Sequence, residues 1–108
     1  MEAAMRALAE PNRRRILELV AGAERSAGEI AAEFAVTRPA VSQHLAVLRQ
    51  AGLIEERREG TRRLYRVRPE GFVPLRDFLE RFWDDRLERL RLAAEFEEGR
   101  RHRGSSSG

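Results

Sequence analysis

The sequence contains no cysteine and no lysine, and only two histidines in 108 residues. Without cysteine there are no disulfides, thiolate metal sites or cysteine nucleophiles. The two histidines, His44 and His102, are too few for a multi-histidine metal centre within one chain, and no G-x-S-x-G nucleophile elbow occurs. This inventory argues against an enzyme, and it predicts neither a metal nor a cofactor.

Long apolar runs are also missing. None approaches the roughly 18 apolar residues of a membrane-spanning helix, and the first residues lack the apolar core of a signal peptide. Hydrophobic residues still make up 42% of the chain, which is enough for one domain with a modest core. We therefore expect a cytoplasmic protein without a membrane partner, folded as a single domain over residues 1–98. The polar residues 99–108, rich in Gly and Ser at their end, are expected to form a flexible tail.

All 21 basic residues are arginine, and they are unevenly distributed. Residues 53–68 carry six Arg and three Glu, whereas residues 69–99 carry five Arg and nine acidic residues. Codon bias in a GC-rich genome explains the choice of arginine over lysine, but not its position. Because the planar guanidinium fork can bond two phosphate oxygens at once, the basic segment indicates a polyanionic partner.

The first half of the chain predicts four helices, over residues 2–9, 11–22, 26–34 and 38–51. Proline or a capping residue starts the last three, and glycine follows or ends two of them. Only a tight turn, residues 35–37, separates the third helix from the fourth.

The fourth helix has one apolar stripe. Val41, Leu45 and Leu48 recur at the 3.6-residue helical period, and the opposite side is polar, with small residues and arginines at its edges. The pattern changes after Gly52, where two strand-like segments flank a Glu-Gly-Thr turn signal. A helical pattern then runs from residue 72 to residue 90. This order predicts a mainly α protein with a β-hairpin (α+β), a winged helix-turn-helix.

At this point the sequence resembles the ArsR (arsenical-resistance regulator) family. The resemblance lies in residues 7–17, 28–31, 38–54 and 58–65. Its most specific part is the string S-x-H-L-x-x-L-x-x-A-G-L, which begins at Ser42. The similarity is strong over residues 3–68 and looser to residue 92. It implies a homodimeric transcriptional repressor that binds double-stranded DNA.

The sensor residues of that family are not matched. Its metal sensors often carry Cys-x-Cys in the third helix, where this chain has Glu29-Ile30-Ala31. Others use aspartate, histidine and glutamate in the last helix, where residues 84–87 read DDRL. The resemblance therefore implies a branch without a metal site, and no pattern identifies a small-molecule effector. A metal-responsive repressor with an atypical site is kept as an alternative.

The second helix of a helix-turn-helix enters the major groove with its N-terminal residues on base edges. Arg38 is suited to guanine and Gln43 to adenine. For His44, packing and phosphate contact are both open. The predicted DNA contacts are Thr37, Arg38, Pro39, Ser42, Gln43, His44 and Arg49 in the helix, and Arg57, Arg58, Thr61, Arg62 and Arg63 in the hairpin. The competing interpretations are an ordinary solvated helix face and charges that keep an exposed strand from aggregating. The run Arg13-Arg14-Arg15 either touches the DNA backbone or forms a solvated first turn.

The broad aromatic stripe of the last helix is wider than so small a chain covers by itself. It predicts core plus dimer interface, with a hydrophobic effector pocket as the competing interpretation. The predicted interface residues are Met5, Leu8, Phe72, Leu75, Phe78, Leu79, Phe82, Trp83, Leu87 and Leu90.

The sequence therefore predicts a homodimeric repressor on an inverted-repeat operator. The alternative from another class is a winged-helix module that binds RNA or protein.

Overall fold

The computed structural model describes residues 1–106, apart from the side chains of Asp85, Leu87 and residues 101–106. The chain divides into two compact units, of which the first is Met1–Leu75 and the second begins at Arg76. The predicted domain ran to residue 98, and the extent of the functional domain stays a prediction.

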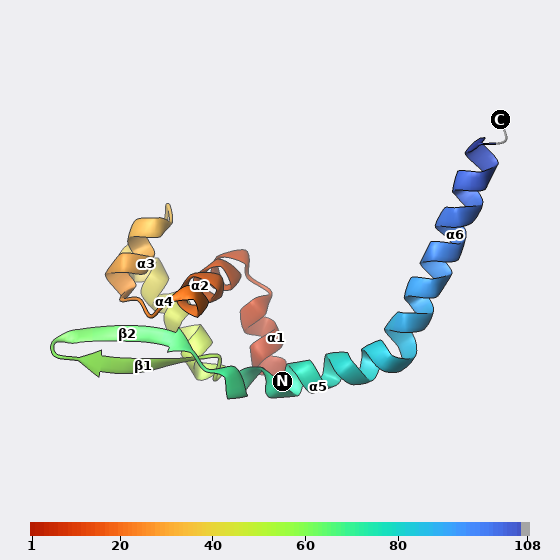
Figure 1. The fold of residues 1–108 in the computed structure, drawn as a ribbon. Helices are drawn as coiled ribbons and strands as arrows, with labels where there is room; N and C mark the ends of the chain where they lie inside the picture. The colour runs from red at the N-terminus through yellow and green to blue at the C-terminus, as the bar shows by residue number, and fades with distance from the viewer. Residues whose placement is uncertain (107–108) are drawn as a thin grey trace. The chain divides into compact units, whose positions relative to one another are not determined.

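The first unit contains four helices followed by a hairpin (Figure 1). The helices are α1 (Glu2–Leu8), α2 (Pro11–Gly22), α3 (Ala27–Glu33) and α4 (Arg38–Gln50). Strands β1 (Ile54–Glu59) and β2 (Arg62–Val67) pair antiparallel, and a 3₁₀ turn, η1 (Pro69–Phe72), follows. This is the predicted winged helix-turn-helix, with α3 and α4 as its two helices and the hairpin as its wing.

The core lies where α4 packs against α1, α2, α3 and β1. The predicted stripe of α4 is fully buried there, with Val41, Leu45 and Leu48 all at most 2% exposed. Ile16 and Ile30 contribute from α2 and α3, and are 0% exposed. Burial of one stripe leaves the opposite side of α4 free to face a partner.

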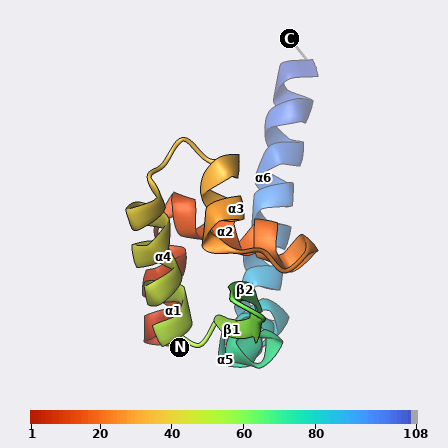
Figure 2. The same ribbon diagram turned by 90° about the vertical axis from the view of Figure 1, so that its left-hand side faces the viewer.

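The loop before α3 forms a short backbone pairing with the hairpin. Arg25, in the loop before α3, pairs with Tyr65 of β2 through two backbone hydrogen bonds, of 3.2 and 2.8 Å. Figure 2 views the hairpin nearly end-on, with α3 above it and α4 to its left. The wing is thereby attached to the helix-turn-helix at the start of α3.

Glycines close the two turns that determine the position of the wing. Gly52 follows α4 with φ at +75°, and Gly60 begins the two-residue hairpin turn with φ at +64°. Both angles favour glycine, because a Cβ disfavours the left-handed region. A two-residue turn with glycine in its first position matches the twist of antiparallel strands.

The remaining helices are α5 (Val73–Phe82), the π-helical turn η2 (Trp83–Leu87) and α6 (Glu88–Ser106). The long helix predicted from the aromatic stripe is thus present, but it is interrupted by one wider turn. Helix α6 continues to Ser106, past residue 98, where the sequence predicted a flexible tail to begin. Of that predicted tail, Ser107 and Gly108 lie outside the described residues.

Candidate nucleic-acid interface

Helices α3 and α4 are fixed at their N-termini by side-chain caps. Ser26 Oγ accepts the N–H of Glu29 at 3.2 Å, and the Glu29 carboxylate accepts the N–H of Ser26 at 3.2 Å, which completes the predicted capping box. Thr37 Oγ1 accepts the N–H of Ala40 at 3.2 Å. Of the predicted DNA contacts, Thr37 therefore has its side chain engaged as the cap of α4.

The outer face of α4 carries most of the residues predicted to read DNA. The exposed ones are Arg38, Pro39, Ser42, Gln43 and Arg49. The His44 side chain is only 19% exposed, and its Nδ1 lies 3.9 Å from the Glu10 carboxylate at the start of α2. The structure thus separates His44 from this outer face, and packing between α4 and α2 accounts for its position.

The wing concentrates positive charge near its turn, which extends beyond the helices in Figure 1. Arg58 of β1 stands directly opposite Arg63 of β2, and the next pair towards the turn is Glu59 with Arg62. Two like charges facing each other across a hairpin destabilise it. An anion beside the two guanidinium groups offsets this repulsion, and the Glu56 carboxylate lies 3.7 Å from Arg63.

The wing and the helix-turn-helix enclose a hollow of about 410 Å³ between them. Its lining residues are Ser26, Ala27, Arg38, Ser42, Thr61, Arg62, Arg63 and Tyr65. Five of the predicted contacts therefore meet at one place, although at least 19 positions of sequence separate the two in α4 from the three in the wing. Three of the others, Gln43, Arg49 and Arg58, are exposed outside it. Ser26, Ala27 and Tyr65 were not predicted, because only the bridge between Arg25 and Tyr65 brings them there.

Several of the arginines predicted to contact DNA form ion pairs with carboxylates of the same chain. Arg62 pairs with Glu29, and the pKa of the Glu29 carboxyl lies below its ordinary value, mainly because Ser26 donates to it. Glu56 accepts Arg49 at 2.7 Å and lies 3.7 Å from Arg63.

Two of the predicted cations are unpaired. Arg38 and Arg58 form no ion pair with any residue in the described part of the chain. These two are therefore the most available to an external anion.

Residues 10–56 match the sequence profile described as "Bacterial regulatory protein, arsR family". Over 80 residues the chain is 49% identical to the HTH-type transcriptional regulator Rv2034 of Mycobacterium tuberculosis, covering 74% of this chain and 75% of that protein. The chain belongs to the arsR family. Its fold and these matches make it a transcriptional regulator with a DNA-binding winged helix-turn-helix.

Two further arsR-type relatives are informative. The transcriptional repressor SdpR of Bacillus subtilis is 40% identical over 60 residues, covering 56% of this chain and 67% of that protein. The homodimeric winged helix-turn-helix DNA-binding domain of Mb0332 from Mycobacterium bovis superposes with a TM-score of 0.63 at 35% identity, covering 80% of each chain.

The arginine run of α2 has a structural role in this arsR-family chain. Arg13 donates to the carbonyl oxygens of Ala7 at 2.7 Å and Arg6 at 3.2 Å, and Arg14 donates to that of Leu8 at 2.5 Å. These oxygens belong to the last turn of α1, where the regular helical N–H partners end; that of Arg6 also accepts the N–H of Ala9 at 3.2 Å. Arg13 and Arg14 thus cap α1, which sequence reasoning missed because cap and helix end lie in different elements.

The predicted dimer residues differ in their exposure. Met5, Leu79, Trp83 and Leu90 are exposed, at 46%, 52%, 55% and 60%. Leu8, Phe72 and Leu75 are partly buried and pack against the core of the first unit. The Leu87 side chain lies outside the described residues. Leu92 and Phe96, at 53% and 60% exposed, extend the apolar surface beyond the predicted set.

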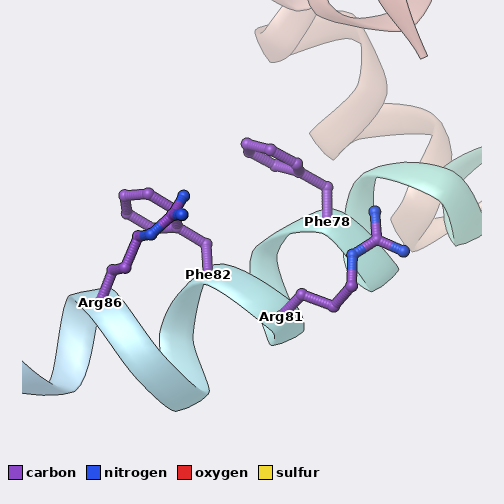
Figure 3. Close-up of a pocket in the computed structure, with 4 residues that line it drawn as sticks. All are labelled: Phe78, Arg81, Phe82 and Arg86. Carbon is purple, nitrogen blue, oxygen red and sulfur yellow. The ribbon is translucent and has the colours of Figure 1, made fainter.

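Figure 3 shows the aromatic part of this surface in the second unit. The rings of Phe78 and Phe82 stack with centroids 6.1 Å apart, and the Arg86 guanidinium lies 5.9 Å from the Phe82 centroid. Together with Arg81 they line a hollow of about 320 Å³.

The described part of the chain offers neither a metal site nor a membrane span. No group of three or more His, Cys, Asp or Glu side chains there is placed to hold a metal ion. No helix in the same part of the chain is both long enough and apolar enough to cross a bilayer.

Proposed function

We propose that this arsR-family regulator is a homodimer that represses transcription by binding an inverted-repeat operator. The observation that carries the proposal is the arginine-lined hollow between α4 and the wing, which joins the exposed face of α4 to the basic hairpin. A surface of this kind suits a groove of duplex DNA bordered by its phosphates.

Helix α4 is the proposed reader of base edges. Arg38 and Gln43 stand exposed in its first half, which is the end that enters the major groove in a helix-turn-helix. Arg38 has the fork geometry for guanine O6 and N7, and Gln43 has the amide for adenine N6 and N7. Ser42 and Arg49 are placed on the same exposed face to contact the flanking backbone.

The wing is the proposed phosphate clamp. Arg58 lies on β1 just before its turn, and Arg62 and Arg63 lie on β2 just after it, with Thr61 in the turn itself. DNA phosphates replace Glu29 and Glu56 as partners of Arg62 and Arg63, so each contact exchanges one anion for another. Affinity then falls steeply with salt, because each neutralised phosphate releases counterions.

Dimerisation is proposed to cover the exposed apolar side chains of the second unit. Leu79, Trp83 and Leu90 are each more than half exposed, and several large apolar side chains exposed on one helical segment are typical of an interface. The related domain of Mb0332 is homodimeric. Two recognition helices in one dimer read two half-sites about one helical turn apart, which gives an inverted repeat.

Repression is the proposed outcome because the relative SdpR is a transcriptional repressor. A dimer seated on a promoter excludes the polymerase without any further domain.

The test is selection of bound duplexes from a randomised DNA library at near-physiological salt, followed by sequencing. We expect an enriched inverted repeat. Arg38→Ala and Gln43→Ala should each relax the preference at one position per half-site, at a loss of about 1–3 kcal/mol. Gln50→Ala, at the other end of α4, is the matched control and should leave the selected sequence unchanged. Strong binding at low salt without any enriched sequence would contradict operator recognition and direct attention to RNA and protein partners.

A further inference from the structure

One carboxylate joins both strands of the wing to the loop before α3. Arg57 of β1 donates from Nε to Glu24 Oε1 at 3.3 Å and from Nη2 to Glu24 Oε2 at 2.6 Å, and Arg66 of β2 donates from Nη1 to Glu24 Oε1 at 3.4 Å. The pairing with Arg57 is bidentate, the geometry in which an arginine–carboxylate contact is most directional. It spans 33 residues of sequence.

The backbone reinforces this connection at the next residue. Arg25 exchanges two hydrogen bonds with Tyr65, which lies between Leu64 and Arg66 on β2. The side-chain contact and the backbone contact thus act on adjacent residues of the same loop. The pKa of the Glu24 carboxyl lies below its ordinary value, chiefly because Arg57 donates to it.

Arg57 differs from its neighbour Arg58 in its ion pairs. Its guanidinium is committed to Glu24 and to Glu59, the latter at 3.2 Å. Arg58 has no such partner among the described residues. The sequence assigned the same role to both residues, whereas the structure gives them different surroundings.

We propose that Glu24 is a positioning residue for DNA binding, which holds the wing against the helix-turn-helix through Arg57 and Arg66. Arg57 acts in this tether and not as a phosphate contact. The inference rests on the proposed function, since it concerns how the wing reaches DNA. The tether fixes the distance between the exposed cations of the wing and the recognition helix α4, so that both reach one duplex without a loss of conformational freedom on binding.

Glu24→Gln separates this role from simple electrostatics, because the two predict opposite results. The substitution keeps the side-chain size and removes one negative charge, so charge alone predicts tighter DNA binding. Loss of the tether predicts weaker binding. We expect Kd to rise about tenfold, the size of one charge-assisted hydrogen bond. Glu33→Gln, on α3, removes the same charge from a residue that has no ion pair among the described residues, and it should tighten binding slightly or leave it unchanged.

The salt dependence of binding separates Arg57 from Arg58. Kd is measured by fluorescence anisotropy over a range of salt, on the duplex enriched by selection and on one fixed duplex of unrelated sequence. Arg58→Gln should make the slope of log K against log salt shallower by about 0.9, as expected for one lost phosphate contact. Arg57→Gln should lower affinity without changing that slope. In a double-mutant cycle, adding Glu24→Gln to Arg57→Gln should have little further effect.

Hydrogen exchange tests the tether without DNA. In Glu24→Gln we expect faster exchange of the Arg25 and Tyr65 amides, with the amides of α4 unchanged. The proposal is overturned if exchange at these two amides is unchanged, or if Glu24→Gln binds DNA as tightly as Glu33→Gln. A shallower salt slope for Arg57→Gln would overturn it as well. Failure of the proposed function is a separate result, seen when the unmodified protein selects no sequence or binds neither duplex, and the exchange measurement still decides whether the tether exists.

Discussion

Gly71 packs directly on the backbone of Gly52, so that a Cβ at residue 71 would lie 1.9 Å from the Gly52 carbonyl oxygen. The contact joins the 3₁₀ turn after the wing to the turn that ends α4. Because the obstructing atoms are backbone, no side-chain movement relieves the overlap.

Gly71→Ala should therefore lower the free energy of unfolding by about 2–3 kcal/mol, the upper part of the range for overpacking. Urea unfolding followed by circular dichroism measures it. Gly22→Ala is the control, since no atom lies within 4 Å of a Cβ at that position, and it should be neutral or slightly stabilising. Equal stability of the two variants would contradict the close contact.

Glu29 forms an ion pair with Arg62, a proposed phosphate contact, so we expect it to compete with DNA for this arginine. Glu29→Gln should raise DNA affinity about threefold, because Arg62 is released while glutamine still serves at the third position of a capping box. The measurement is a direct titration with the selected duplex. Ser26→Ala breaks the capping box without freeing Arg62, so it should lower stability by about 1 kcal/mol and leave affinity no tighter. An affinity of Glu29→Gln equal to that of the unmodified protein would show that the ion pair does not compete.

Acid should destabilise the protein through its paired carboxylates. The pKa values of Glu24 and Glu88 lie below the ordinary 4.5, mainly because Arg57 and Arg91 donate to them, and that of Glu29 is lowered by Ser26. A group whose folded pKa is depressed contributes stability that is present above its ordinary pKa and is lost as pH falls through the folded value. We expect the urea midpoint to fall as pH is lowered below about 4.5.

Glu24→Gln supplies the comparison for this pH dependence. It should have the lower midpoint at neutral pH and the shallower acid decline, since one of the titrating groups is gone. Parallel curves for the variant and the unmodified protein would exclude Glu24 as a contributor.

A single charged substitution among the exposed apolar side chains of the second unit tests whether they form the dimer interface. Leu79→Glu places a carboxylate at a side chain that is 52% exposed in the single chain, and burying it in an interface is costly. We expect dissociation to monomers in analytical ultracentrifugation and loss of cooperative operator binding. Arg89→Glu introduces the same side chain at an exposed charged position of α6 and should leave the dimer intact. A dimer that survives Leu79→Glu would place the interface elsewhere.

Local signals predicted most of the fold. The capping box of α3, the stripe of α4 and the glycine of the hairpin turn each act within a few residues, and each is confirmed. The interruption of the last helix by a π-helical turn was not predicted, because the apolar spacing on either side of Trp83 reads as one continuous helix.

Contacts between distant residues could not be predicted in the same way. All the arginines of the wing look alike in sequence, and only the pairing of Glu24 with Arg57, 33 residues away, separates the engaged cation from the unpaired Arg58. The same holds for Arg13 and for Gly71, whose partners are backbone oxygens of other elements. The sequence places the candidate site, and the tertiary contacts divide its residues into those that hold the surface and those that are free to bind.

The register of the hairpin also limits how wings of this type can vary in length. Leu64, on β2, is buried opposite Arg57, and successive residues alternate between the two faces of the strand. A single residue inserted between Gly60 and Leu64 would rotate the leucine into solvent and turn an arginine inward. Insertions of two residues, one in each strand next to the turn, preserve both faces. Natural or engineered wings should therefore lengthen in matched pairs, reaching further along the duplex while the core beneath them stays the same.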